Sequence, residues 1–154
     1  MSGAPSDFPS GTRLRRSMSR APELAERLLF QEALSVAGNA YAPYSGYAVG
    51  AVAVGPSGRS HHGANVENAA SPAGLCAERA ALAALVTHGE RELRFVAVAA
   101  LDGSDCLPCG FCLQALAEFG DPELVVRAAG ELTVVRLREL LTTPFAPPEE
   151  NTGA

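Results

Sequence analysis

Apolar residues recur at intervals of three and four along three segments of the chain, which predicts three amphipathic helices. They span residues 22–37, Ala77–His88 and Cys109–Phe119, and each is followed by a glycine, the residue that most often ends a helix. Pro108 is suited to open the third helix, because a helix leaves the amide hydrogens of its first turn unpaired. A single helical turn is expected over Arg138–Leu141.

Short apolar runs rich in β-branched residues lie between these helices and predict strands. The five runs are Tyr47–Val54, Ser60–Ala64, Phe95–Leu101, Leu124–Ala128 and Leu132–Val135. A Pro-Ser-Gly turn joins the first two as a hairpin, and the third is apolar throughout, as expected of a strand covered on both faces. A hairpin followed by alternating helices and strands indicates an α/β fold, with helices on the faces of a mixed sheet of about five strands.

The 154 residues have the length of one domain. We place this domain at residues 21–145, between a Ser-, Gly- and Arg-rich leader (1–20), expected to be disordered, and a flexible acidic tail (146–154). Arg15-Arg16 resembles a twin-arginine export signal, but no apolar stretch follows it, and an organelle transit peptide is a second alternative. No apolar run approaches the roughly 18 residues of a membrane span, so we expect a soluble, cytoplasmic protein without a membrane partner.

Charge is distributed unevenly along the chain. All 12 basic residues are arginines; residues 1–20 carry a net charge of +3 and the remainder −8, which gives the formal net charge of −5. An acidic domain repels phosphate backbones, so the attraction on which nucleic-acid binding depends is missing. We therefore expect a small neutral or cationic ligand and no nucleic-acid partner.

Three of the four cysteines have the spacing of a metal site. Cys109 and Cys112 lie three residues apart on an expected helix, so their thiols share one face, and Cys76 stands at the start of the preceding long helix. Three thiolates leave one coordination position open, which is the arrangement of a catalytic rather than a structural zinc ion. Glu78, two residues after Cys76, is then close enough to move protons at that position.

Cys106, three residues before Cys109, leaves two alternatives open. Four cysteines could close a structural zinc site in a module that binds a partner, or the run C-L-P-C-G-F-C could hold an iron–sulfur cluster. Pro108 argues against both, because it leaves Cys106 in the loop before the helix, as an ordinary loop cysteine. The histidines are expected on the surface of strands and helices rather than as ligands: His61, His62 and His88.

Cys76-Ala77-Glu78 and Pro108-Cys109-Gly110-Phe111-Cys112 match the Cys-x-Glu and Pro-Cys-x-x-Cys signature of zinc deaminases. More specifically, the chain resembles the small homotetrameric cytidine deaminases over roughly residues 31–145. The resemblance implies their three-layer α/β/α fold. The matching segments follow the family's order: residues 42–45, 49–51, 65–69, 76–79, 108–114 and 118–119.

This resemblance implies one zinc ion per chain, held by Cys76, Cys109 and Cys112 with water as the fourth ligand. It makes Glu78 the catalytic residue, which takes a proton from the attacking water and delivers protons to N3 and to the departing amine. The implied reaction converts cytidine or deoxycytidine to uridine or deoxyuridine and ammonia, as in pyrimidine salvage. Arg79 would donate a hydrogen bond to thiolate sulfur.

The resemblance also implies the substrate contacts. Asn65 and Glu67 match the residues that bind a ribose hydroxyl, although either could instead be a turn or sheet-edge residue. The backbone amide of Ala77 and the carbonyl of Leu107 or Pro108 would read the edge of the base.

Phe145 matches a C-terminal phenylalanine that reaches into a neighbouring subunit's site. The resemblance therefore implies a homotetramer with shared active sites. Alternatively, Phe145 covers the core of its own subunit.

Three positions depart from the family pattern. Tyr47 replaces a phenylalanine of the base pocket, Ser71 stands where tyrosine is common, and Leu113 replaces the arginine that usually follows the last zinc cysteine. These departures leave open a modified cytosine nucleoside, such as an aminopyrimidine antibiotic, as the substrate. An enzyme that edits polynucleotides is disfavoured, because the domain is acidic and the chain has no tryptophan.

Overall fold

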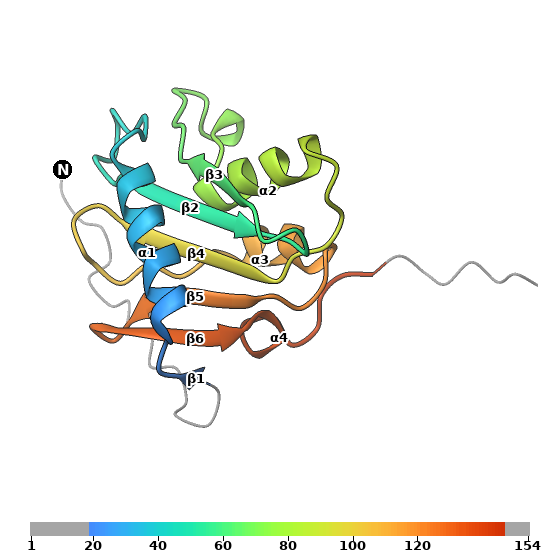
Figure 1. The fold of residues 1–154 in the computed structure, drawn as a ribbon. Coiled ribbons are helices and arrows are strands. Elements are labelled where there is room, and N and C mark those ends of the chain that lie inside the picture. Colours follow the sequence, from blue (N-terminus) through green and yellow to red (C-terminus); the bar gives the residue numbers. More distant parts are fainter. Residues whose placement is uncertain (1–18, 147–154) are drawn as a thin grey trace, which may run out of the picture.

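Six strands form one mixed sheet in the order β1-β6-β5-β4-β2-β3 (Figure 1). β4 and β5 are parallel, and the other four pairs are antiparallel. The computed structural model describes residues 19–146. The mixed sheet is as predicted, with one strand more than the five expected. The strands are β1 (Ser19–Arg20), β2 (Val49–Val54), β3 (Ser60–Ala64), β4 (Phe95–Ala100), β5 (Glu123–Ala128) and β6 (Glu131–Arg136).

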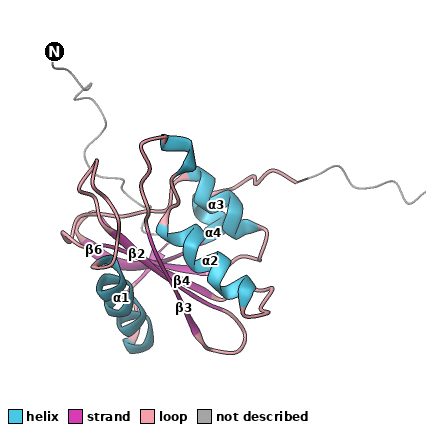
Figure 2. Ribbon diagram, turned by 90° about the horizontal axis from the view of Figure 1, so that it is seen from above, coloured by secondary structure: helices cyan, strands magenta, loops and turns pink. Residues whose placement is uncertain are grey.

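Helices cover both faces of the sheet, which confirms the three-layer α/β/α fold (Figure 2). One face carries α1, and the other carries α2, α3 and α4. Within the described range, no helix has both the length and the apolar character needed to cross a membrane. The helices are α1 (Leu24–Ala37), the 3₁₀ turn η1 (Ser71–Ala73), α2 (Ala77–Thr87), α3 (Gly110–Ala117) and α4 (Leu137–Leu140).

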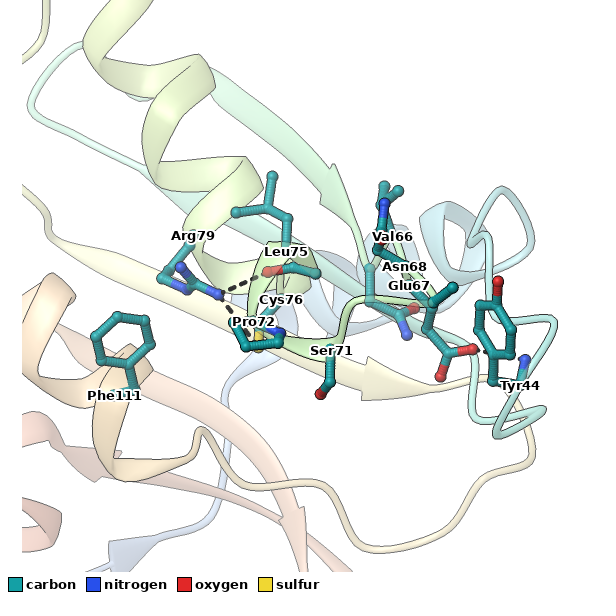
Figure 3. A pocket seen from close by; sticks show the side chains of 13 residues that line it. Tyr44, Val66, Glu67, Asn68, Ser71, Pro72, Leu75, Cys76, Arg79 and Phe111 are labelled. Carbon is teal, nitrogen blue, oxygen red and sulfur yellow. Dashed lines mark hydrogen bonds between the residues drawn. The ribbon is translucent and has the colours of Figure 1, made fainter.

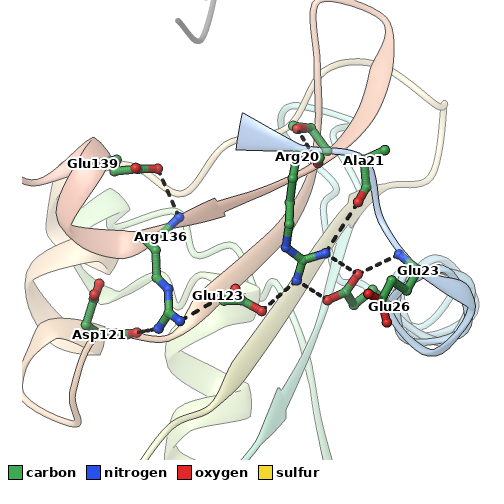
Figure 4. Close-up of polar contacts among 9 residues, drawn as sticks. Arg20, Ala21, Glu23, Glu26, Asp121, Glu123, Arg136 and Glu139 are labelled. Atoms are coloured by element: carbon green, nitrogen blue, oxygen red, sulfur yellow. Dashed lines mark hydrogen bonds and ion pairs between the residues drawn. The ribbon is translucent and has the colours of Figure 1, made fainter. Parts of the chain in front are cut away.

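The sixth strand, β1, comes from two residues that the sequence pattern placed in the leader. It pairs with β6, and the guanidinium of Arg20 contacts both Glu26 of α1 and, at 2.7 Å, Glu123 of β5 (Figure 4). Glu26 is only 6% exposed, so Arg20 neutralises an otherwise uncompensated buried charge. The ordered domain thus includes residues 19 and 20. The rest of the expected leader and residues 147–154 of the expected tail lie outside the described residues.

Alternation along the strands divides the core into two parts. In β4, Val96 and Val98 pack on the side of α2 and α3, whereas Ala97 and Ala99 pack on the side of α1. β4 is buried along nearly its whole length, as predicted for a strand covered on both faces.

Two glycines let the helices approach the sheet closely. A Cβ atom on Gly50 of β2 would lie 2.1 Å from the carbonyl oxygen of Ala33 in α1. A Cβ atom on Gly63 of β3 would lie 2.2 Å from the amide nitrogen of Ala81 in α2. Both distances are too short for non-bonded atoms. Each helix can therefore pack this close to its strand only because the strand residue facing it is a glycine.

His61 is buried, which contradicts its expected place on the surface. Its side chain points inward from β3, with Nε2 2.9 Å from a carboxylate oxygen of Glu90 and the ring 5.0 Å from that of His88. The neighbouring His62 is exposed, as predicted. Adjacent strand residues point to opposite faces, so one of the two histidines had to turn inward.

The register of the sheet brings several chain segments to one edge. Gly50 at the start of β2 pairs with Ala64 at the end of β3, and Val49 pairs with Ala100 at the end of β4. The segment before β2 and the segments after β3 and β4 therefore meet. Because β5 runs parallel to β4, its end reaches the same edge.

Candidate active site

The thiols of Cys76, Cys109 and Cys112 lie within 4.8 Å of one another. Cys76 caps the start of α2, Cys109 caps the start of α3, and Cys112 lies in the first turn of α3. Both helices therefore direct the positive end of their dipoles at the cluster, which favours thiolate. The fold thus brings together the three cysteines that the sequence spacing selected.

This set of donors fits a zinc ion. Sulfur ligands about 2.3 Å from a tetrahedral zinc ion lie about 3.8 Å apart, so the observed cluster needs only small shifts to close on one. Burial, followed by repulsion from Glu78 and Cys76, raises the pKa of the Cys112 thiol well above its ordinary value. A divalent cation would remove that repulsion and allow Cys112 to bind as thiolate.

Cys106 lies outside the cluster, as predicted, but it is more than an ordinary loop cysteine. It is 6% exposed, and its amide donates to the carbonyl oxygen of Arg127 at 3.1 Å. Burial raises the pKa of its thiol to about 11. Cys106 lines the same cavity as Glu78 and Tyr47.

Glu78 is the second residue of α2 and is 5% exposed. Burial raises the pKa of its carboxyl above the ordinary value, while its own backbone amide, Cys112 and Arg79 act in the opposite direction. A carboxyl group with a raised pKa can both accept and return a proton near neutral pH. Its place beside the thiol cluster gives it access to whatever binds there.

Arg79 contacts the cluster at Cys76 (Figure 3). Its Nη2 atom donates to the carbonyl oxygen of Gly74 at 3.3 Å and to the sulfur of Cys76 at 3.9 Å, as expected of a donor to thiolate. Its guanidinium also lies over the ring of Phe111, 4.6 Å from the centroid. The sequence pattern did not predict this cation–π contact; the available signal was an aromatic residue between two metal-spaced cysteines.

Two cavities meet at this site. The larger, of about 620 Å³, is lined by residues that include Tyr44, Glu67, Ser71, Arg79 and Phe111 (Figure 3). The smaller, of about 400 Å³, is lined in part by Glu78 and is therefore the candidate binding cavity for the base of the substrate. Asn65 and Cys76 line both. The remaining residues of the smaller cavity are Tyr47, Val49, Asp105, Cys106, Leu107, Cys109 and Ala128.

Asn65 already has two partners within the chain. Its Oδ1 accepts the amide hydrogen of Val49 at 2.8 Å, and its Nδ2 donates to the carbonyl oxygen of Tyr47 at 2.9 Å. Asn65 therefore does have a structural role at the sheet edge, where its side chain holds the backbone before β2. The amide retains a second hydrogen and further lone pairs, so this role leaves room for a ligand contact.

Glu67 is also engaged. Its carboxylate accepts the amide hydrogens of Tyr44 at 2.8 Å and Ser45 at 3.2 Å, as well as the Ser45 hydroxyl. The Ser45 hydroxyl and then the Tyr44 amide lower the pKa of this carboxyl. Glu67 thus remains an acceptor, which is the property that a ribose hydroxyl requires.

The other predicted contact residues lie in different surroundings. Ala77 is fully buried as the first residue of α2, and Pro108 is buried directly before the cap of α3.

Phe145 is 78% exposed, so the alternative that it covers its own core is wrong. The side chain of Gln114 brackets the backbone of Phe145 with hydrogen bonds of 2.8 and 3.0 Å. Leu113, one of the departures from the family pattern, is buried in the core.

Comparisons with known proteins agree with this geometry. Residues 24–128 match the family model of the cytidine and deoxycytidylate deaminase zinc-binding region. A cytidine deaminase of Mycobacterium tuberculosis is 42% identical over 107 residues, which cover 68% of this chain and 79% of the relative. A cytidine deaminase of Sporosarcina psychrophila is 34% identical over 121 residues, covering 77% of this chain and 89% of the relative.

Solved structures give the same result. The crystal structure of the M. tuberculosis cytidine deaminase aligns with a TM-score of 0.73 at 35% identity, over 81% of this chain and all of that chain. That of the Burkholderia pseudomallei cytidine deaminase aligns with a TM-score of 0.71 at 35% identity, over 77% and 98% of the two chains. With its thiol cluster and neighbouring buried carboxyl, this chain belongs to the cytidine deaminase family.

Proposed function

We propose that this protein is a zinc-dependent hydrolase that converts cytidine and deoxycytidine to uridine and deoxyuridine, with release of ammonia, in pyrimidine salvage. The observation that carries the proposal is the position of Glu78. This buried carboxyl shares a cavity with a cluster of three thiols that suits zinc. Family membership supplies the reaction class.

Cys76, Cys109 and Cys112 would hold one zinc ion per chain. When bound, zinc supplies Lewis acidity, which lowers the pKa of water into the neutral range. Three thiolates leave zinc with a net negative charge, which weakens this effect. Arg79, which donates to the sulfur of Cys76, and the positive ends of α2 and α3 offset part of that charge.

Glu78 moves the protons of the reaction. It takes one from the attacking water and passes it to N3 of the pyrimidine, then takes a second from the hydroxyl now attached to C4 and delivers it to the amine, which leaves as ammonia while the C4 carbonyl forms. Its raised pKa suits both halves of this cycle, since the group must accept and release a proton in each turnover.

An uncharged nucleoside fits the smaller cavity better than a nucleotide. Among the described residues that line it, Glu78 and Asp105 are acidic and none is basic, so a phosphate group would be repelled. Asn65 and Glu67 would bind the ribose, the amide of Ala77 would contact the base edge, and Tyr47 would line the base pocket. A neutral substrate also agrees with the acidic domain.

The active site would be completed by a neighbouring copy in a cytoplasmic homotetramer. Phe145 is exposed and held by Gln114 in a fixed place, and Phe111 is exposed at the rim of the larger cavity. Such exposed aromatic residues are typical of contact surfaces. The free thiols suit the reducing cytoplasm.

An absorbance assay on the full-length protein, combined with zinc analysis, tests this proposal. Substrates should include cytidine, deoxycytidine, their monophosphates, free cytosine and an aminopyrimidine nucleoside antibiotic. We expect one zinc per chain and deamination of the two nucleosides. Cys112→Ser should lose zinc and activity, whereas the matched Cys106→Ala should keep its zinc. A zinc-loaded protein that deaminates no nucleoside would contradict the proposal and favour the four-cysteine binding module; turnover of the antibiotic alone would favour the modified-nucleoside alternative.

A further inference from the structure

Hydrogen bonds hold the backbone of Tyr47 at both its amide and its carbonyl group. Its amide donates to the hydroxyl oxygen of Ser45 at 3.0 Å, and its carbonyl oxygen accepts from Asn65 at 2.9 Å. The same Asn65 side chain accepts the amide hydrogen of Val49 at 2.8 Å. The start of this side chain is therefore fixed relative to the first residue of β2.

The far end of the side chain is tied to a second segment. The Tyr47 hydroxyl donates to the carbonyl oxygen of Asp105 at 3.4 Å, and the next residue, Cys106, lines the same cavity. That segment is itself anchored, since the Cys106 amide donates to the carbonyl oxygen of Arg127 at 3.1 Å, and a carboxylate oxygen of Asp105 accepts the Gly130 amide at 2.9 Å. Tyr47, Asp105 and Cys106, which we call the tyrosine wall, thus form a braced side of the smaller cavity.

The proposed reaction assigns most of the pyrimidine ring to other sides of this cavity. C4 and N3 must face Glu78, which exchanges protons with them. N1 carries the ribose and points toward Asn65, which lines both cavities. The C5–C6 edge of the ring is left for the tyrosine wall.

Resting on the proposed function, we infer that the tyrosine wall sets the largest substituent at C5 that the enzyme accepts. The wall selects cytosine nucleosides unsubstituted at C5. A phenylalanine in place of Tyr47 could tilt away from a C5 substituent, because it lacks the hydroxyl tether. The braced tyrosine cannot tilt without losing its hydrogen bond to Asp105, so binding of a C5-substituted nucleoside costs the free energy of that bond.

The test is the ratio of kcat/KM for 5-methylcytidine to that for cytidine. Tyr47→Phe should raise this ratio about five-fold, which is the effect of one neutral hydrogen bond, mainly through a lower KM for 5-methylcytidine. Tyr47→Ala should raise it at least ten-fold. Cys106→Ala, which opens the same wall from its other side, should shift it in the same direction and serves if Tyr47→Ala does not fold. Tyr41→Phe is the matched control, because Tyr41 is 58% exposed and its ratio should equal that of the wild type.

The inference is overturned if the ratio stays within two-fold of wild type in Tyr47→Phe and Cys106→Ala while cytidine is still deaminated. It is also overturned if Tyr41→Phe shifts the ratio as much as Tyr47→Phe, since the hydroxyl tether would then not be the cause. A zinc-loaded wild-type protein that does not deaminate cytidine is a different result. That outcome overturns the proposed function, and this inference with it.

Discussion

Glu26 and Glu78 are both buried glutamates in the first turn of a helix, α1 for one and α2 for the other, yet their pKa values shift in opposite directions. Arg20 binds Glu26 directly and lowers the pKa of that carboxyl, whereas burial raises the pKa of Glu78. Arg79 follows Glu78 in sequence but turns to Gly74 and Cys76 instead. A buried acid paired with a base serves the structure, and one without such a pair is available for proton transfer.

The same contrast extends over the two faces of the sheet. The core on the α1 face, which includes Phe30, Ala33 and Val52, is apolar packing. The opposite face combines packing with the thiol cluster and Glu78 at the starts of α2 and α3. We therefore expect substitutions near α1 to change stability and substitutions near α2 to change chemistry.

The largest effect is expected for Glu78→Gln. The amide cannot accept and return the proton, so kcat for cytidine should fall by between about 10²-fold and 10⁴-fold. Zinc content and melting temperature should stay near wild type, since the substitution keeps the shape of the side chain and removes a carboxyl group whose charged form is costly to bury. More than a few per cent residual kcat in a zinc-loaded variant would show that Glu78 is not the proton shuttle.

Phe30→Ala is the corresponding change on the α1 face. Phe30 is 4% exposed, and removal of a buried phenylalanine costs about 3–5 kcal/mol of the free energy of unfolding. Denaturant unfolding should show this loss, while kcat per folded, zinc-loaded chain should remain close to wild type. A large fall in kcat, measured at denaturant concentrations too low to unfold the variant, would mean that the two faces are coupled.

Gly63→Ala and Gly50→Ala form a matched pair that tests this division. Each added methyl group would collide with helix backbone, of α2 for Gly63 and of α1 for Gly50, and should cost about 1–3 kcal/mol in unfolding free energy. Only Gly63→Ala should also reduce kcat, because α2 carries Cys76 and Glu78. Equal kcat values for the two variants, measured well below their melting temperatures, would refute the distinction.

The smallest effect is expected for Arg20→Ala, and it should depend on pH. Arg20 is partly exposed to solvent, so we expect a loss of about 1 kcal/mol of unfolding free energy at pH 7. The pKa of Glu26 is depressed in the folded state, so this stabilisation is present above the unfolded-state value near 4.5 and disappears as pH falls through the lower folded-state value. Unfolding curves of the two proteins should converge at acidic pH; a constant difference would place the effect in β1 pairing instead.

Apart from β1 and the 3₁₀ turn η1, the helices and strands could be predicted from the sequence to within two residues of their ends. Apolar periodicity reports burial directly, and glycines mark helix ends, so β3 was predicted at its observed bounds and α2 differs by one residue. β1 could not be predicted, because a two-residue strand has no periodicity and Arg20 meets Glu123 only in the folded chain. The burial of His61 was missed for a related reason, since its partner Glu90 lies on a distant loop.

The chemistry of the thiol cluster was predictable from the sequence, because the short spacings place Cys112 in the first turn after Cys109 and Glu78 close to Cys76. The walls of the cavity were not. Tyr47, Asn65 and Cys106 meet only because the sheet register brings the start of β2 and the ends of β3 and β4 to one edge. The raised pKa of Glu78 likewise depends on burial by distant segments. Local spacing determines which atoms can react, whereas burial, charge and the shape of the pocket are sums over the whole fold.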